Sequence, residues 1–558
     1  MRPGRRPAPP LGFHLDPRWI AVLAGVFVVS VGVRLYGALT FGVGMDGPGT
    51  FRMINYDEGN SCEGKLGYLP YPTFVGAQII WIATHLGYPP PAPLPKRPGN
   101  WAAPYPEDDW RAAQEGARAK AYCESRVLIL IQRTYSAVTG ALSAVLVCLL
   151  ALMMWPSRPQ IAWTAAALLG LSNFHVAESH SATVDVPQVF FILLLTVVLS
   201  YGVVSRKRWP FVVSPVLLAW AVWAKWYVFA VCGYACLVPR LQIRKHWRAY
   251  LLASLCLAVV GAVLVGQAGW NAMPQIIHDR AYLLWGDETG RFGTDYGHIG
   301  SWRRWIRNST DLFIVHIVGL GLPACLFVWH GISRAAAARE MRGLWLAHAP
   351  AAGYALYMLV LGPVTYYRHY LPLFPTVTLL AAYGFWESRW ATKKLFLAVF
   401  LLYPLLLTID SEYNYRCDPR RELRPWSQAH PGARILFSYY VVPPATATAR
   451  LFDMDAYLHD GARYLAQTDY LILSENWYDT AFPNELNGPI AWDPAWLIKT
   501  KPEYALAYRK ILSNQDPNLE LETELNLKPF TPEFLIHRFF YGSFQLFIGD
   551  LKIFRVKK

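Results

Sequence analysis

Long apolar runs constrain this chain more than any other feature. Of its 558 residues, 54% are hydrophobic and only 16% are charged. Most of the apolar residues gather in runs of roughly 17–25, long enough to cross a hydrocarbon core of ~30 Å, and the fifth and sixth runs are shorter. The runs cover residues 18–41, 127–154, 161–176, 184–204, 210–224, 226–239, 249–268, 311–331, 345–362, 370–387 and 394–410. This pattern predicts an α-helical polytopic membrane protein with about 11 transmembrane helices.

The basic residues predict an orientation. The formal net charge is +14, which in a soluble chain would first suggest nucleic acid. With the N-terminus in the cytoplasm, every inner segment is basic. These segments carry Arg2, Arg5 and Arg6; Arg158; Arg206, Lys207 and Arg208; Arg240, Arg244, Lys245 and Arg248; Arg334, Arg339 and Arg342; and Arg389, Lys393 and Lys394. We therefore expect an inner (plasma) membrane protein with a cytoplasmic N-terminus, and no nucleic-acid partner.

A change in amino-acid composition near residue 411 predicts two regions. Residues 1–410 would form the transmembrane domain, with long outer loops at 42–126 and 269–310. Residues 411–558 mix short apolar stretches with Pro, Asn and Asp. An odd number of spans would place this C-terminal region outside, as a small extracytoplasmic α/β domain.

Within residues 411–558, Ile435–Phe437 and Tyr470–Leu473 have the short apolar pattern of buried strands. Segments 449–466 and 494–513 are expected to be helical, and 546–555 to form a closing hairpin.

Three of the eight cysteines lie outside the apolar runs. Cys62 and Cys123 flank the same outer loop, where an oxidising environment permits a disulfide. A bridge between them and two free thiols both remain open. No CxxC or Cys/His spacing indicates a zinc site.

The first candidate site is the acidic pair Asp57 and Glu58, which follows the first apolar run and precedes the stretch Leu69–Phe74, rich in Pro and aromatic residues. Ionisable groups at the mouth of a membrane bundle are costly unless they are used. The alternative is a solvated loop pair that caps a helix.

The second candidate is a polar turn between the third and fourth runs, with His175, Glu178, His180 and Asp185. Two His and a Glu could ligate a metal. Hydrogen-bonded helix ends are the plainer explanation, with Asp185 capping the fourth span.

The third candidate is Tyr367-Arg368-His369, at the outer end of the ninth and tenth runs. A guanidinium at the membrane surface is well placed for a phosphate, although snorkelling in an aromatic belt would place it there too. Lys225, between Trp223 and Trp226, could pair with a phosphate or an acid, or act as an interfacial anchor.

The order and common sidedness of these segments resemble the GT-C fold membrane glycosyltransferases, in particular the protein O-mannosyltransferases and the lipid A aminoarabinose transferases. This resemblance implies an inverting transfer of a sugar from a polyprenyl-monophosphate carrier to a hydroxyl of an extracytoplasmic protein, lipid or glycan acceptor. It implies no cofactor, although a divalent metal stays open. The insertion at 88–125 and the His/Glu-rich turn depart from the pattern.

The resemblance implies that Asp57 is the base. From the chemistry of the residues together with the resemblance, we expect Glu58 to orient the acceptor or share the proton; Arg368, His369 and Lys225 to lie at the donor phosphate; and Glu178, His180, Asp185 and Tyr367 to lie at the substrate.

Other functions stay open. An O-antigen ligase or polymerase with a diphosphate carrier would centre on loop 269–310. A transporter would show repeated halves and polar residues at the midplane, which this sequence lacks. A membrane scaffold would bind partners without transfer. No P-loop, HExxH, GxSxG set or dinucleotide fingerprint is present.

Overall fold

The structure is a computed structural model. It describes residues 17–45, 50–55, 58–66, 73–92, 106–225, 233–235, 302–338, 342–360, 367–392, 394–438, 440–441, 443, 448–478, 502–541 and 549–558. The predicted spans 226–239 (apart from 233–235) and 249–268 lie outside these residues. So do most of loop 269–310, Asp57, the side chain of Tyr367 and most of the predicted hairpin.

Four described helical segments are long and apolar enough to cross a membrane: α1 (Pro17–Thr40), α5 (Arg126–Met154), α8 (Asp185–Ser205) and Lys394–Ala429, which contains α18 (Lys394–Arg416). The bent pair α13 (Trp302–Leu320) and α14 (Leu322–Ala337) would make a fifth. Three further apolar helices are shorter: α3 (Thr73–His85), α9 (Trp209–Lys225) and α16 (Ala349–Val360). The expected total of eleven spans remains a prediction.

The other helices before the sheet are α2 (Asn60–Lys65), α4 (Pro106–Cys123), α6 (Pro159–Gly170), α7 (Asn173–Glu178), α15 (Arg342–Leu346), η3 (Tyr367–Leu373), α17 (Phe374–Trp386), η4 (Arg389–Thr392), η5 (Pro419–Arg421) and α19 (Leu423–Ala429).

The prediction of one continuous span at 311–331 is wrong. The chain breaks at Gly321, and the two helices meet at 120°. Gly321 has φ 83°, a left-handed conformation that favours glycine, and an added Cβ would lie 2.6 Å from the Tyr403 ring. The next helix also carries a proline in its first turn. The apolar pattern could not reveal this break because both halves are apolar.

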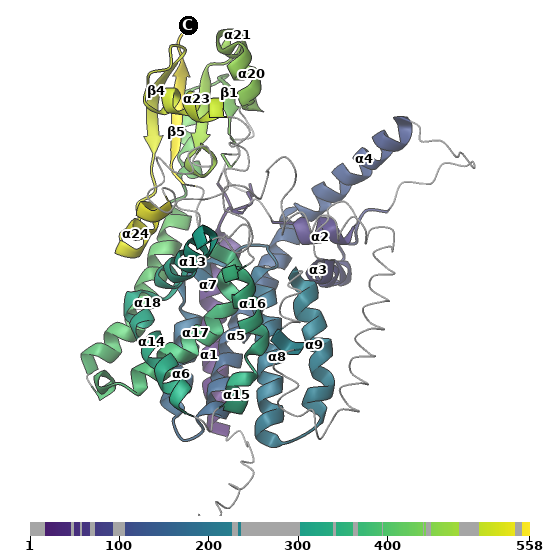
Figure 1. Cartoon of the computed structure of the whole chain (residues 1–558). Helices are drawn as coiled ribbons and strands as arrows, with labels where there is room; N and C mark the ends of the chain where they lie inside the picture. The colour runs from purple at the N-terminus through teal and green to yellow at the C-terminus, as the bar shows by residue number, and fades with distance from the viewer. Residues whose placement is uncertain are drawn as a thin grey trace, which may run out of the picture.

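The helical part is built from helices that pack side by side. Helix α5 packs against α1, α6 and α8; α8 packs against α9; and α14 packs against α17 (Figure 1). The Phe385 and Phe400 rings stack at 4.3 Å between centroids, and Trp155 stacks on Tyr383 at 4.6 Å. These contacts make one large apolar core.

The two ends of this helical bundle can be told apart. At one end, Arg158 pairs with Glu387, which joins the α5–α6 connection to the end of α17. At the other end, the Phe174 ring of α7 lies 6.0 Å from the Phe374 ring at the start of α17. Figure 1 shows α1 starting at the end of the bundle away from the sheet.

The C-terminal region contains a five-stranded sheet in the order β2-β1-β3-β5-β4. The strands are β1 (Arg434–Phe437), β2 (Thr448–Leu451), β3 (Tyr470–Ser474), β4 (Leu519–Leu525) and β5 (Leu551–Val556). Strand β1 is parallel to β2 and β3, and β5 is antiparallel to β3 and β4. The segments predicted as buried strands therefore lie in β1 and β3.

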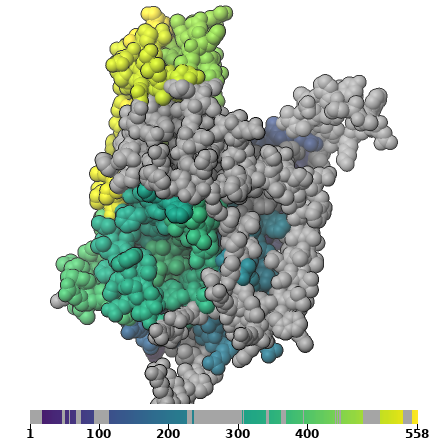
Figure 2. Space-filling model, in the orientation of Figure 1, coloured from purple at the N-terminus to yellow at the C-terminus, as the bar shows by residue number. Residues whose placement is uncertain are grey.

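The helices of this region are α20 (Met454–His459), α21 (Gly461–Leu465), α22 (Glu475–Tyr478), α23 (Pro502–Leu512) and α24 (Pro532–Tyr541). Figure 2 shows the sheet region gathered at one end of the molecule, beyond the described helices.

Buried hydrogen bonds join the sheet region to α18. The Asp410 carboxylate accepts hydrogen bonds from the Thr531 backbone N–H at 2.7 Å and from its hydroxyl at 2.6 Å. Asn414 Oδ1 accepts one from the Lys528 N–H at 3.0 Å, and Glu533 accepts one from the Tyr403 hydroxyl at 2.9 Å. The segment 527–533 is therefore fastened along the end of α18.

Candidate active site

The first loop folds back on the end of α1. Val43 and Phe51 form an antiparallel bridge, and the Arg52 N–H donates to the Gly42 carbonyl at 2.8 Å. Farther along, Arg420 Nη1 donates to the Met53 carbonyl at 3.1 Å. The approach to the acidic pair is thus held from two elements far apart in the chain.

Glu58 is fully buried in an ion pair with Arg133 of α5. Arg133 Nε lies 2.7 Å from Glu58 Oε1, and Nη2 lies 2.7 Å from Oε2. The same carboxylate accepts from the Ile54 N–H at 2.9 Å and the Ala182 N–H at 2.8 Å. A buried charge persists when it is paired and hydrogen-bonded in this way. Glu58 therefore ties the loop to both α5 and the turn before α8.

This arrangement bears on the roles expected for the acidic pair. Both Glu58 oxygens are engaged by protein groups, so the carboxylate stabilises the loop from inside. Asp57 lies outside the described residues, between Asn55 and Glu58, and the Glu58 N–H donates to the Asn55 carbonyl at 3.3 Å. The expected role of Asp57 as the base stays a prediction.

A disulfide closes the loop that follows. Cys62 of α2 and Cys123 at the end of α4 are bonded, with Cα atoms 5.6 Å apart. This settles the alternative left open by the sequence. Beside the bridge, burial and the neighbouring Glu124 raise the pKa of Glu63, and burial raises the pKa of Glu124.

Arg34 anchors α1 to the polar turn. Its guanidinium donates to the Ser30 hydroxyl at 2.6 Å, the Gly170 carbonyl at 2.9 Å and the Ser179 hydroxyl at 3.2 Å, and it lies 2.9 Å from His175 Nδ1. Arg34 is fully buried. Arg34 lies inside an apolar run, and a charged group in a membrane span is expected to have a polar or charged partner. The sequence therefore indicated that Arg34 is paired, but not with which residues.

His180 meets an acid that the sequence did not indicate. His180 Nε2 lies 3.4 Å from Glu412 Oε1 of α18, and the imidazole packs edge-on against Phe41 at 5.2 Å. The space is tight, because a Cβ on Gly37 of α1 would lie 2.5 Å from the imidazole. Glu412 follows the last apolar run. The sequence marked it only as a carboxylate just beyond that run, which does not indicate a contact with His180.

Asp185 and Lys225 pair with each other. Asp185 begins α8, Lys225 ends α9, and both side chains are buried or nearly so. Lys225 and Asp185 thus form an ion pair between neighbouring helices, in place of the interfacial anchor and the helix cap that were the alternatives. Glu178, at the end of α7, is also buried.

Arg368 and His369 lie half-buried in η3, which packs against α8 and α16. The His369 carbonyl accepts from the Tyr354 hydroxyl, and the Tyr370 hydroxyl donates to the Asn308 carbonyl at 3.2 Å. Because Phe374 directly follows η3 and contacts α7, Arg368 lies at the same end of the bundle as the Glu58 loop.

An apolar groove of about 530 Å³ extends from the end of η3, between α13, α14, α16 and α17. Leu373, Val377 and Leu380 form one wall, and the exposed side chains Phe313 and Trp329 lie along its rim. Within the described ranges, no three His, Cys, Asp or Glu side chains come together in a way that could hold a metal ion.

Residues 118–270 match the family model of the dolichyl-phosphate-mannose-protein mannosyltransferases. The matched segment contains Arg133, the polar turn, Asp185 and Lys225. This match confirms the resemblance to GT-C membrane glycosyltransferases. No curated protein matches the chain.

Three solved structures are similar at low identity. The archaeal oligosaccharyltransferase AglB from Archaeoglobus fulgidus, in complex with an inhibitory peptide and a dolichol-phosphate, has TM-score 0.43 and 10% identity, over 97% of this chain and 88% of that chain. ArnT from Cupriavidus metallidurans, bound to undecaprenyl phosphate, has TM-score 0.43 and 12% identity, over 83% and 94%. The A. fulgidus oligosaccharyltransferase in complex with Zn and sulfate has TM-score 0.46 and 12% identity, over 96% and 88%.

Proposed function

We propose that this chain, which resembles the dolichyl-phosphate-mannose-protein mannosyltransferases over residues 118–270, is an inverting glycosyltransferase of the plasma membrane. It takes a sugar from a polyprenyl-monophosphate carrier and passes it to a hydroxyl of an extracytoplasmic acceptor. The N-terminus lies in the cytoplasm, and residues 411–558 form an α/β domain on the outer side, where the acceptor is met.

The observation that carries this proposal is the buried Glu58–Arg133 pair and its bond to Ala182. It joins the first loop to two parts of the family-matched segment. A catalytic base must be held in a fixed position to act, and this assembly holds the residue next to Asp57. Glu58 is therefore a positioning residue.

In the proposed reaction, Asp57 accepts the proton of the acceptor hydroxyl. The hydroxyl oxygen forms a bond to the anomeric carbon as the bond from that carbon to the carrier phosphate breaks on the opposite face. The phosphate leaves with the bonding electrons and gains negative charge. Arg368 and His369 stabilise that charge, since cationic donors aimed at developing charge lower the barrier.

The groove beside η3 supports a lipid-linked donor. It begins at Leu373, five positions after Arg368 in the same element, and it is almost wholly lined by apolar side chains. A polyprenyl tail would lie in this groove while its phosphate reaches Arg368. Lys225 serves this site through Asp185, which it holds at the start of α8.

The decisive test replaces the base without changing its size. Asp57→Asn is expected to abolish sugar transfer in proteoliposomes while the unfolding midpoint in detergent stays at the wild-type value. Glu387→Gln, at the opposite end of the bundle, is the matched control and should retain transfer. Transfer by Asp57→Asn at the wild-type rate would refute the proposed base.

Mass spectrometry of copurified lipid identifies the carrier in the same preparation. We expect a polyprenyl-monophosphate sugar. A diphosphate-linked glycan would instead support the ligase-like alternative.

A further inference from the structure

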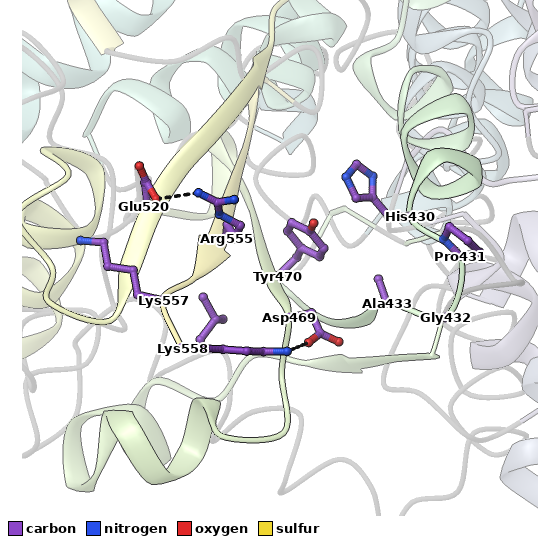
Figure 3. Close-up of a pocket in the computed structure, with 11 residues that line it drawn as sticks. His430, Pro431, Gly432, Ala433, Asp469, Tyr470, Glu520, Arg555, Lys557 and Lys558 are labelled. Atoms are coloured by element: carbon purple, nitrogen blue, oxygen red, sulfur yellow. Dashed lines mark hydrogen bonds and ion pairs between the residues drawn. The ribbon is translucent and has the colours of Figure 1, made fainter.

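We infer that the sheet region carries a second binding site, a cleft for an acidic saccharide. It has a volume of about 640 Å³ and is lined by the turn at 430–433, the start of β3, Glu520 of β4 and the end of β5. Small-molecule sites in proteins usually measure ~300–1,000 Å³. Figure 3 shows the residues around it.

One face of the sheet forms its floor. Tyr470 of β3 and Glu520 of β4 are both cross-strand partners of Arg555 in β5. Side chains directly opposite in adjacent strands lie on the same face of a sheet. Tyr470, Arg555 and Glu520 therefore form a row across three strands, and Figure 3 shows Tyr470 between Arg555 and His430.

His430 forms the wall beside this row, and Trp426 packs against both His430 and Tyr470. The His430 ring lies 5.1 Å from the Tyr470 ring, and the Trp426 ring lies 4.6 Å from His430 and 4.9 Å from Tyr470. An amphipathic ring with a polar tip offers both an apolar face and a hydrogen bond. That combination matches a pyranose, whose C–H face is apolar and whose edge is made of hydroxyls.

Ion pairs surround the cleft. Arg555 Nη2 lies 3.0 Å from Glu520 Oε2, and Lys558 Nζ lies 2.8 Å from Asp469 Oδ1. The Arg555 and Lys558 side chains are 59% and 72% exposed, so such pairs add little to stability. Stability therefore does not explain their concentration here. Each pair presents a donor and an acceptor side by side, which is what two neighbouring sugar hydroxyls require.

Lys557 makes the cleft select for negative charge. It lies two positions after Arg555 and donates to the Asp516 carbonyl at 3.3 Å. In the described part of the chain no carboxylate lies within ion-pair distance of its ammonium group. An acidic group on the sugar, such as a uronic acid carboxylate, would form an ion pair with the Lys557 ammonium group. Hydrogen bonds from Arg434 and Lys558 lower the pKa of Asp469.

The ligand comes from the aqueous side. Figure 1 shows the C-terminus at the end of the sheet away from the helical bundle, and the last four residues line the cleft. A lipid headgroup in the plane of the bundle does not reach that end. The ligand is therefore a part of a long acceptor glycan, held away from the point of transfer. That this glycan is the acceptor rests on the proposed function, whereas the presence of the binding site does not.

The test measures binding by the full-length protein in detergent, with oligogalacturonate as the probe and maltohexaose as the neutral control. Wild type is expected to bind oligogalacturonate saturably and at least tenfold more tightly than maltohexaose. Lys557→Ala should weaken binding about tenfold, whereas Lys510→Ala, which removes an exposed lysine from α23, should leave it unchanged.

Tyr470→Ala should also weaken binding, and Tyr470→Phe should weaken it less, because it keeps the ring and loses only the hydroxyl. Equal binding by wild type and Lys557→Ala would overturn the inference, as would inorganic phosphate binding as tightly as the saccharide. Asp57→Asn should bind like wild type. If it also keeps full transfer activity, the proposed function fails while this site stands.

Discussion

At the scale of single residues, the candidate site depends on charges that are buried and paired inside the bundle. Glu58 and Arg133 hold the first loop, and Arg34 holds α1 to the turn before α8. The sequence singled out Asp57 and Glu58 but gave Arg133 no role, although a charge in an apolar run predicts a partner. Glu412 could not be found in this way, because which helix end faces His180 is decided by packing.

Removing the Glu58 charge is expected to destabilise the protein strongly. Glu58→Gln leaves Arg133 buried without its counter-charge, a change that costs about 3–5 kcal/mol. Glu387→Gln breaks an ion pair of which one side chain is 45% exposed, and should cost about 1 kcal/mol or less. Thermal unfolding in detergent measures both. Equal midpoints for the two variants would contradict the structural role of Glu58.

The close contact between Gly37 and His180 predicts a second effect. Gly37→Ala places a methyl group 2.5 Å from the imidazole, and overpacking of this kind costs about 1–3 kcal/mol. Gly32→Ala lies on the same helix with open space around it and should be neutral or slightly stabilising. We expect lost sugar transfer in the first variant and full transfer in the second. The same transfer rate in both would mean that His180 position does not matter.

At the scale of elements, the apolar pattern located most described helices within a few residues, for example α1, α5 and α8. It failed at Gly321, where a left-handed residue divides one apolar run into two helices. The periodicity of apolar residues and their hydropathy indicate which segments are buried. They do not indicate the backbone conformation of a single glycine. The strands of the sheet were predictable at β1 and β3 because both are buried, whereas their order depends on long-range pairing.

The disulfide between Cys62 and Cys123 is expected to stabilise the first-loop helices. The two residues are 61 positions apart, and closing such a loop contributes about 4 kcal/mol by chain entropy. The double variant Cys62→Ser, Cys123→Ser should unfold at a lower temperature and lose transfer. Cys417→Ser, which removes a free thiol, should do neither. A mobility shift on reducing gels that is absent from the double variant verifies the bridge.

At the scale of the whole molecule, polar contacts join the sheet region to the bundle at Asp410, Asn414 and Glu533. The sequence predicted a boundary near residue 410, but these bonds cross it, and α18 continues to Arg416. Contacts between parts distant in the chain carry no local sequence signal. The two predicted domains thus share a bonded junction.

Asp410→Ala is expected to loosen this junction. It leaves the N–H groups of Phe530 and Thr531 without their acceptor, at about 1–3 kcal/mol for each buried group. Hydrogen exchange at 527–533 should rise at least tenfold. Glu422→Ala, an exposed carboxylate close to the same junction, should leave exchange unchanged. Protection that survives Asp410→Ala would show that apolar packing alone fastens the segment.

The bridge between Cys62 and Cys123 also sets an order of events during biogenesis. In the proposed orientation, a newly inserted chain carries both thiols reduced, and its first loop is bridged only after the loop has been exported and oxidised. The protein would therefore be inactive during membrane insertion and become active only after the two thiols are oxidised. Pulse-labelled cells deprived of thiol oxidation should accumulate inserted but inactive chains, and full activity there would disprove this timing.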